Sequence, residues 1–200
     1  MTNILYIYDN NLYVNLTNQC PCRCTFCIRS QKNGLGSSDN LWLEHTPTAH
    51  EVIAAFKKYS LSDFEQVIFC GYGEPLCALD ELISVCNYIR SISDIKIRLN
   101  TNGLGDLINC KPTAPLLKGV VDAVSISLNA PDAAKYLQVT RPSFGAGAFE
   151  SMLKFAQECK QYIPEVKFSV VDVISKEDIL ACQNLADRMD IPLRVRHFNS

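Results

Sequence analysis

Short apolar segments typical of buried strands alternate with longer segments of helical spacing along almost the whole chain. The strand-like segments are 12–16, 66–70, 95–100, 120–128, 166–174 and 193–198. Helical spacing is found over 47–59, 79–92, 148–161 and 176–189, with a short helical piece near Pro115. Strands separated by helices pair in parallel, with right-handed crossovers. The first prediction is therefore an α/β fold.

The start of the chain adds a different element. Apolar segments 4–8 and 12–16 flank Asp9, Asn10 and Asn11, which are typical of a hairpin turn. The second arm of this hairpin would be the first of six parallel strands, and six strand–helix units are two fewer than a closed eight-stranded barrel needs. We predict a partial (β/α)6 TIM barrel with an N-terminal β-hairpin, open on one side.

Composition limits the class of protein. The chain has 200 residues, of which 48% are apolar, so we expect one domain over 1–200 with a single core. Its 19 basic and 21 acidic residues give a net charge of −2, which argues against direct binding of nucleic acid. The sequence lacks an apolar run of the roughly eighteen residues that cross a bilayer, and its start lacks a secretory pattern. We therefore expect a cytoplasmic protein without a membrane role.

Several consecutive strand-like segments carry polar side chains at alternate positions. The sets are Lys96, Arg98, Asn100 and Asn102; Ser125, Ser127 and Asn129; Asp172; and Arg194 and Arg196. Alternation places each set on one face of its strand, opposite apolar residues. An edge strand with one wet face would look the same, but a polar face shared by several neighbouring strands favours the lining of a cavity.

Ten cysteines are many for this length, and without a secretory signal we expect thiols or metal ligands rather than disulfides. Four of them lie within eight residues: Cys20, Cys22, Cys24 and Cys27. The other six are scattered singly, and we expect them to be small buried hydrophobic residues. They are Cys70, Cys77, Cys86, Cys110, Cys159 and Cys182.

The spacing Cys20-x3-Cys24-x2-Cys27 suits an iron–sulfur cube. Such a short loop can wrap three corners of the cube and leave the fourth iron open to a substrate or cofactor. The alternative is a structural zinc site that uses all four thiols, or three thiols and His45, although structural zinc usually takes its ligands from two separated pairs. The role of Cys22 stays open at this point.

This cysteine motif, with the aromatic Phe26 before its last thiol, resembles that of the radical S-adenosylmethionine (SAM) superfamily. Three further segments resemble the family's motifs in the same order along the chain: Gly-Tyr-Gly-Glu-Pro at 71–75, Asn-Thr-Asn-Gly at 100–103, and Ser-Ile-Ser-Leu-Asn at 125–129. One departure is Tyr72, which stands where the family has glycine. The resemblance covers these four motifs and agrees with the predicted partial barrel.

The resemblance implies a [4Fe–4S] cluster on Cys20, Cys24 and Cys27, and SAM as a second cofactor. An external donor of the flavodoxin or ferredoxin type would supply an electron, SAM would be cleaved, and the resulting 5′-deoxyadenosyl radical would abstract hydrogen from a substrate. Glu74 would hold the SAM amino group. The other SAM-binding residues that the resemblance implies are Phe26, Tyr72, Gly73, Asn100, Ser127 and Asn129.

Segments 18–29, 41–44 and 70–76 also resemble a compact subgroup, the TatD-linked radical SAM proteins. That subgroup includes queuine lyase, so the resemblance implies a small substrate, queuine, cleaved to 7-aminomethyl-7-deazaguanine in queuosine salvage. The candidate substrate-binding residues are Tyr13, Asn15, Trp42, Glu44, His45, Arg98, Asp172, Arg196 and His197. Glu44, and after it Asp172, would accept hydrogen bonds from the guanine-like edge, while Arg98 or Arg196 would bind the diol.

Some of these residues could instead have purely structural roles. Trp42 could cover the core, Glu44 could cap the helix that begins near Pro47, and His45 could be solvated. Two other functions also stay open. One is a radical activase acting on a partner protein, and the other is a non-enzymatic binding module in which a metal only stabilises the fold.

Overall fold

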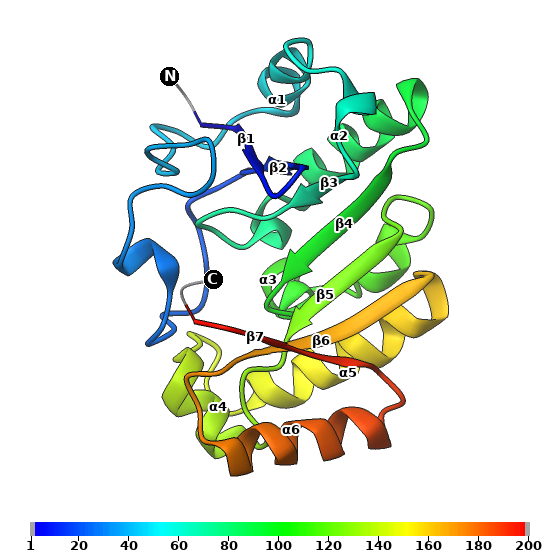
Figure 1. Ribbon diagram of the computed structural model, residues 1–200. Helices are drawn as coiled ribbons and strands as arrows, with labels where there is room; N and C mark the ends of the chain where they lie inside the picture. The colour runs from blue at the N-terminus through cyan, green and yellow to red at the C-terminus, as the bar shows by residue number, and fades with distance from the viewer. Residues whose placement is uncertain (1–2, 199–200) are drawn as a thin grey trace.

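The computed structural model describes residues 3–198, and its seven strands form one sheet in chain order from β1 to β7. β1 (Leu5–Tyr8) and β2 (Asn11–Val14) are antiparallel, and each later strand is parallel to its predecessor. The later strands are β3 (Gln66–Phe69), β4 (Lys96–Thr101), β5 (Ala123–Ser127), β6 (Glu165–Val171) and β7 (Leu193–Arg196). β1 and β7 form the two edges of a sheet that does not close, so the predicted partial barrel is confirmed (Figure 1).

The hairpin forms because its two turn residues accept a left-handed backbone. Asp9 and Asn10 have φ values of 50° and 57°, and Tyr8 pairs directly with Asn11. Asn and Asp tolerate this conformation better than most residues, and it matches the twist of the two strands.

The helices lie between successive strands. They are α1 (Ala49–Phe56), α2 (Leu79–Ile92), α3 (Gly105–Asn109), α4 (Ala133–Thr140), α5 (Gly147–Tyr162) and α6 (Lys176–Arg188). Short 3-10 turns are η1 (Ile28–Ser30), η2 (Leu61–Asp63), η3 (Pro75–Ala78) and η4 (Ala114–Leu117). The four longer predicted helices are confirmed, whereas α3 and α4 were not predicted. α3 has only five residues, too few for a clear helical period, whereas α4 was missed although it is as long as α1, with eight residues.

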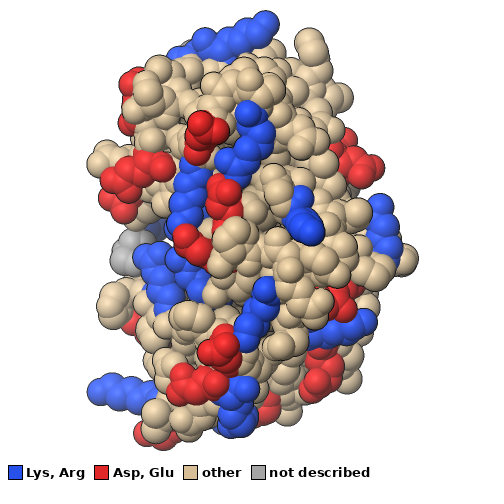
Figure 2. Space-filling model, turned by 90° about the vertical axis from the view of Figure 1, so that its right-hand side faces the viewer, with Lys and Arg blue, Asp and Glu red and all other residues tan. Residues whose placement is uncertain are grey.

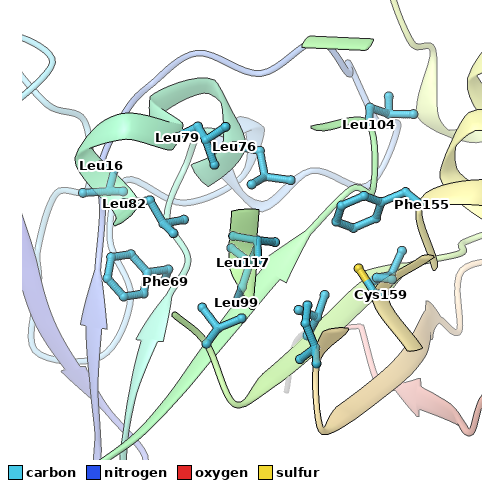
Figure 3. Close-up of a cluster of buried hydrophobic side chains, with 14 of the residues drawn as sticks. Leu16, Phe69, Leu76, Leu79, Leu82, Leu99, Leu104, Leu117, Phe155 and Cys159 are labelled. Atoms are coloured by element: carbon cyan, nitrogen blue, oxygen red, sulfur yellow. The ribbon is translucent and has the colours of Figure 1, made fainter. Parts of the chain in front are cut away.

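The two faces of the sheet differ as the alternation predicts. Ile97 and Leu99 of β4 are buried in the core between the sheet and the helices, while Lys96, Arg98 and Asn100 lie on the other face. Figure 3 shows this core, in which Phe69 from the sheet lies near Leu82 of α2, while Phe155 of α5 lies near Cys159. Polar residues are thereby left on the concave face.

The loop between β2 and α1 lies at the carboxyl ends of the strands, toward which the strand arrows point in Figure 1. Parallel α/β sheets place their functional groups at this end. The four clustered cysteines belong to this loop.

Charged side chains of both signs intermingle on the face shown in Figure 2. Ion pairs at the amino ends of the strands include Lys96 with Glu165 at 2.6 Å and Arg90 with Asp122 at 2.5 Å. This face therefore offers no continuous basic surface to a phosphate backbone. Within residues 3–198 there is no helix whose length and apolarity would let it cross a membrane.

Candidate active site

The cysteine loop is held against the end of α4 by backbone hydrogen bonds. The amides of Arg23 and Thr25 donate to the carbonyl oxygens of Thr140 and Val139 at 3.0 and 2.9 Å. The amide of Cys27 donates to the carbonyl of Cys24 at 3.2 Å, which makes a tight turn between two of the predicted ligands. The loop is therefore fixed by its backbone.

Arg29 is a residue of this loop that the sequence analysis missed. Its guanidinium donates to the carbonyl oxygens of Asn18 and Cys22 at 3.4 and 3.3 Å, so it spans the loop from the inside. Its positive charge also lowers the pKa of Cys20 and Cys24, although the larger cause is a hydrogen bond from the Cys22 thiol. The pKa of Cys20 falls to about 6, so this thiol is readily available as thiolate. A cation two residues after the last cysteine was the available signal.

Cys22 differs from the other three cysteines in burial. It is 3% exposed and belongs to the hydrophobic core, whereas Cys20, Cys24 and Cys27 are half-buried. Three half-buried thiols, two of them with a lowered pKa, are a suitable donor set for an iron–sulfur cluster. The described residues contain no preformed group of three or more His, Cys, Asp or Glu side chains in metal-binding geometry.

The turn after β3 places Glu74 in a buried position, 4% exposed. Its carboxylate accepts hydrogen bonds from the Thr101 hydroxyl at 2.6 Å and from the backbone amides of Asn102 and Leu76 at 2.7 and 3.1 Å. Burial, helped by the nearby charge of Cys20, raises the pKa of Glu74 to about 7. The side chain therefore joins the turn after β3 to the turn after β4.

Gly73 lets this turn approach the cysteine loop. The amide of Glu74 donates to the carbonyl of Gln19 at 2.7 Å, and a Cβ atom on Gly73 would lie 2.6 Å from the same carbonyl oxygen. A Cβ on Gly71 would overlap the side chain of Asn15. Glycine is thus required at both positions of the motif, because neighbouring atoms leave no room for a side chain.

Two buried acceptors in the motifs at the ends of β4 and β5 have no hydrogen-bond partner among the described residues. They are Oδ1 of Asn100, near the end of β4, and Oδ1 of Asn129, two residues after β5. Ser127 ends β5 between them in register with Ser169. Buried acceptors normally have a hydrogen-bond partner, so donors from a bound molecule fit here. The polar groups of SAM suit such a site.

The two aromatic residues of the motifs are Tyr72, in the turn after β3, and Phe26, on the cysteine loop. The Tyr72 hydroxyl donates to the carbonyl of Lys32, and its ring meets Trp42 edge-on with centroids 5.2 Å apart. Tyr72 is buried among the tyrosines of the hairpin, while Phe26 is half-buried on the cysteine loop. Trp42 is 40% exposed, so it only partly covers this cluster.

Several predicted substrate residues lie on the concave face. Tyr13 interacts electrostatically with Arg98 and Cys70. Arg196 interacts electrostatically with Cys70 and Tyr13. Burial raises the pKa of Tyr13 to about 12, and also raises the pKa of the Cys70 thiol. The buried Nε of Arg98 has no hydrogen-bond partner in the part of the chain that the structure describes. Cys70 was expected to be only a small core residue, and instead it lies among these polar groups.

Glu44 lies on a segment that is fastened to the cysteine loop. The Asn18 side chain, which the sequence analysis did not single out, donates to the carbonyl of Leu43 at 2.7 Å and accepts from its amide at 3.1 Å. Glu44 itself is exposed and follows Leu43 directly. The pairing places the backbone next to Glu44 beside Asn18, two residues before Cys20.

The structure places other candidates elsewhere. Asn15 is fully buried and donates to the carbonyl of Leu41 at 2.7 Å, so it joins the hairpin to the following loop. The ring of His45 bonds to Glu51 at 2.9 Å, at the start of α1. The side-chain nitrogen of Asn15 and the ring of His45 therefore have structural partners in the chain. Asp172 bonds to the ring of His197 at 2.8 Å and accepts from the Phe198 amide at 2.7 Å, beyond β6 and β7.

The open parallel barrel and the cysteine loop at its carboxyl end define a class of α/β enzymes that combine an iron–sulfur cluster with a nucleoside cofactor. The family model of the radical SAM superfamily matches residues 14–185, and the chain belongs to this superfamily. Members use a [4Fe–4S] cluster together with SAM. The expected family and its cofactors are thus confirmed.

Two similar curated proteins are GTP 3′,8-cyclases that match most of this chain. A GTP 3′,8-cyclase of Clostridium perfringens is 27% identical over 187 residues, which cover 92% of this chain and 53% of that protein. A GTP 3′,8-cyclase of Corynebacterium glutamicum is 33% identical over 149 residues, which cover 71% of this chain and 37% of that protein. The chain thus spans about half or less of the relatives it matches.

Solved structures share the fold at low sequence identity. Streptococcus suis SuiB bound to its precursor peptide SuiA has a TM-score of 0.70 and 15% identity, with 96% of this chain and 40% of that chain covered. The protein anSMEcpe with bound AdoMet has a TM-score of 0.67 and 17% identity, with 93% and 50% covered. These likenesses support the partial-barrel fold.

Proposed function

We propose that Cys20, Cys24 and Cys27 hold the [4Fe–4S] cluster and that SAM binds beside it, between the turn after β3 and the ends of β4 and β5. The observation that carries this proposal is the pair of buried acceptors on Asn100 and Asn129, which have no partner within residues 3–198. When bound, the two cofactors supply a radical that abstracts hydrogen from a substrate. The chain's own residues bind, orient and shield the reactants.

In this proposal Glu74 accepts a hydrogen bond from the SAM amino group. Its Oε2 accepts one bond within the chain, from Asn102, and a carboxylate oxygen can accept two. Gly73, Asn100, Ser127 and Asn129 complete the polar side of the pocket, and Phe26 and Tyr72 flank it. Removing Glu74 should weaken SAM binding by about 1.5–3 kcal/mol, the usual value for a hydrogen bond to a charged group.

For the substrate we propose queuine, which makes the enzyme a lyase that releases 7-aminomethyl-7-deazaguanine. Glu44 supplies the acceptor for the guanine-like edge, because the Asn18–Leu43 pairing holds it beside the cysteine loop. Arg98, Arg196 and Tyr13 face the diol from the concave side of the sheet. Trp42 covers the base, and Asp172, already bonded to His197, is the second acceptor.

A second candidate is a cyclisation of GTP, because the curated relatives are named GTP 3′,8-cyclase. GTP and queuine share the amino and oxo groups of a guanine-type edge, so Glu44 would serve either substrate. They differ in charge, since GTP carries a triphosphate and queuine carries none. The substrate therefore has to be decided by its reaction.

The deciding experiment uses anaerobically reconstituted protein with SAM and either a chemical reductant or a flavodoxin- or ferredoxin-type donor. Queuine, GTP and guanine are added separately, and the products are identified by mass spectrometry. Formation of 7-aminomethyl-7-deazaguanine from queuine alone supports the lyase, and conversion of GTP alone transfers the assignment to the cyclase. SAM cleavage that responds only to a partner protein would favour the radical activase. Iron-loaded protein that never cleaves SAM would favour a binding module.

A matched pair of variants tests Glu44. Glu44→Gln removes the charge with little change in shape and should weaken binding of the guanine-type substrate about ten- to a hundredfold. Glu177→Gln makes the same change on an exposed residue of α6 and should have no effect. Equal substrate affinity in both variants would contradict the role of Glu44.

A further inference from the structure

The side chain of Asn102 points at the cysteine loop from the turn after β4. Its Nδ2 lies 3.9 Å from the Sγ of Cys20 and 3.8 Å from the Sγ of Cys22. Both distances are within the range of a hydrogen bond to sulfur, which is a larger and softer acceptor than oxygen. The sequence analysis placed Asn102 in the Asn-Thr-Asn-Gly motif and in the polar set of its strand, without a role of its own.

The orientation of this amide is fixed by its other end. The Oδ1 of Asn102 accepts from the amide of Leu104 at 2.9 Å, so the oxygen is already engaged in the turn. The nitrogen must therefore face the sulfur atoms, and a rotated amide would lose the bond to Leu104. Asn102 presents donors, rather than an acceptor, to the thiols.

The backbone of Asn102 is fixed as well. Its amide donates to Oε2 of Glu74 at 2.7 Å, and the Thr101 hydroxyl donates to Oε1 of the same carboxylate at 2.6 Å. Gly103, with φ +77°, leaves no room for a Cβ, which would lie 2.7 Å from the side chain of Met152. Glu74 therefore positions Asn102 in addition to its proposed role toward SAM.

We propose that Asn102 is a positioning residue whose side-chain amide donates a hydrogen bond to the Cys20 sulfur and thereby raises the reduction potential of the cluster. Reduction adds negative charge to the cluster and its thiolates, and a donor aimed at a thiolate stabilises that charge. Cys22, buried and not among the proposed ligands, leaves Cys20 as the ligand that benefits. The inference rests on the proposed ligand set of Cys20, Cys24 and Cys27.

Two variants remove the donor in different ways. Asn102→Asp keeps the acceptor for Leu104 and the shape of the side chain but replaces the donor with an anionic oxygen. Asn102→Ser keeps a short acceptor, cannot reach the sulfur and adds no charge. Asn109→Ser is the control, because Asn109 lies on the following helix α3 and donates only to the carbonyl oxygens of Leu76 and Gly105.

The test is a redox titration of each reconstituted protein, followed by electron paramagnetic resonance, after iron and sulfide have been measured. We expect all variants to load about four irons, as a cube requires. Both Asn102 variants should shift the potential downward, Asp more than Ser. A tenfold fall in the ratio of reduced to oxidised cluster at fixed potential corresponds to about 59 mV for a one-electron couple. Asn109→Ser should match the wild type.

Three results would overturn the proposal. The first is full loading with unchanged potentials in both Asn102 variants, and the second is an equal shift in Asn109→Ser. The third is loss of iron from both Asn102 variants, which would make Asn102 structural. These results are distinguishable from failure of the proposed function, in which the wild-type protein itself binds no iron or sulfide and both proposals fall together.

Discussion

Gly73 lies against the carbonyl group of Thr17 so closely that a Cβ atom at position 73 would overlap it. Thr17 precedes the cysteine motif by three residues, and Gly73 precedes Glu74 directly. The two segments that would hold cluster and SAM are therefore packed backbone to backbone. The first prediction tests this contact.

Gly73→Ala should separate the turn after β3 from the cysteine loop, because backbone atoms cannot move aside as a flexible side chain can. We expect the variant to lose SAM binding and most of its iron, measured by calorimetry and metal analysis. Gly147→Ala is the control, since a Cβ there meets nothing within 4 Å and the residue begins helix α5. It should raise stability by about 0.5–1 kcal/mol. Equal SAM affinity in both variants would contradict the argument.

The second prediction concerns Cys22. Because its side chain is buried in the core and outside the proposed ligand set, Cys22→Ala should retain about four irons per chain after reconstitution. Cys24→Ala should lose the cluster. Cys159→Ala removes another buried thiol, from α5, and controls for loss of packing. If iron analysis found as little iron in Cys22→Ala as in Cys24→Ala, Cys22 would have to be counted among the cluster ligands.

The third prediction is a pH dependence at the start of α1. Hydrogen bonds from the Thr48 backbone, His45 and the Thr48 hydroxyl lower the pKa of Glu51 to about 2, from 4.5. A lowered folded-state pKa gives stability that is present above pH 4.5 and is lost as the pH falls toward 2. Glu51→Gln should therefore flatten the dependence of the unfolding free energy on pH in this window. Urea unfolding at a series of pH values measures it, and parallel curves for variant and wild type would refute it.

The fourth prediction concerns the end of the sheet away from the site. Arg90 donates to Asp122 at 2.5 Å and to the carbonyl of Ile95 at 2.9 Å, and Asp122 also accepts from the amide of Ile97 at 2.7 Å. Both charged side chains are partly exposed, so solvent screening reduces the effect. We expect Asp122→Ala to cost about 1–2 kcal/mol, mainly because the Ile97 amide loses its partner.

Lys154→Ala is the matched control for Asp122→Ala. Its ion pair with Glu158 is longer, 3.6 Å, and its side chain is 69% exposed, so the change should cost less than about 0.5 kcal/mol. Chemical unfolding compares the two variants, and SAM binding should be unchanged in both. Equal losses of stability would show that the Asp122 network adds nothing beyond a surface charge pair.

The sequence predicted the sheet well because alternation is a local signal. The polar and apolar positions of 95–100 alternate, and the structure confirms the two faces of β4. Helix α2 has the predicted bounds, 79–92. The five-residue helix α3 has too few turns to show a period.

The candidate site was predictable where its residues are close together in the sequence, as in the cysteine motif, because such residues are also close in space. Contacts between distant segments could not be predicted. Asn15 and His45 carry suitable polar groups, yet Asn15 serves Leu41 and His45 serves Glu51. Cys70 gains its polar neighbours Arg98 and Arg196 only when β4 and β7 join the sheet.

The order of the strands in the sheet equals their order in the chain. A chain emerging from the ribosome can therefore add each strand to the edge left by the previous one, without waiting for a distant partner. The cysteine loop is synthesised before all the other parts of the proposed cofactor site, yet Glu74, Asn102 and Asn129 arrive only as β3, β4 and β5 are completed. The thiols are thus present early in synthesis, and the pocket that would enclose a cluster forms around them afterwards.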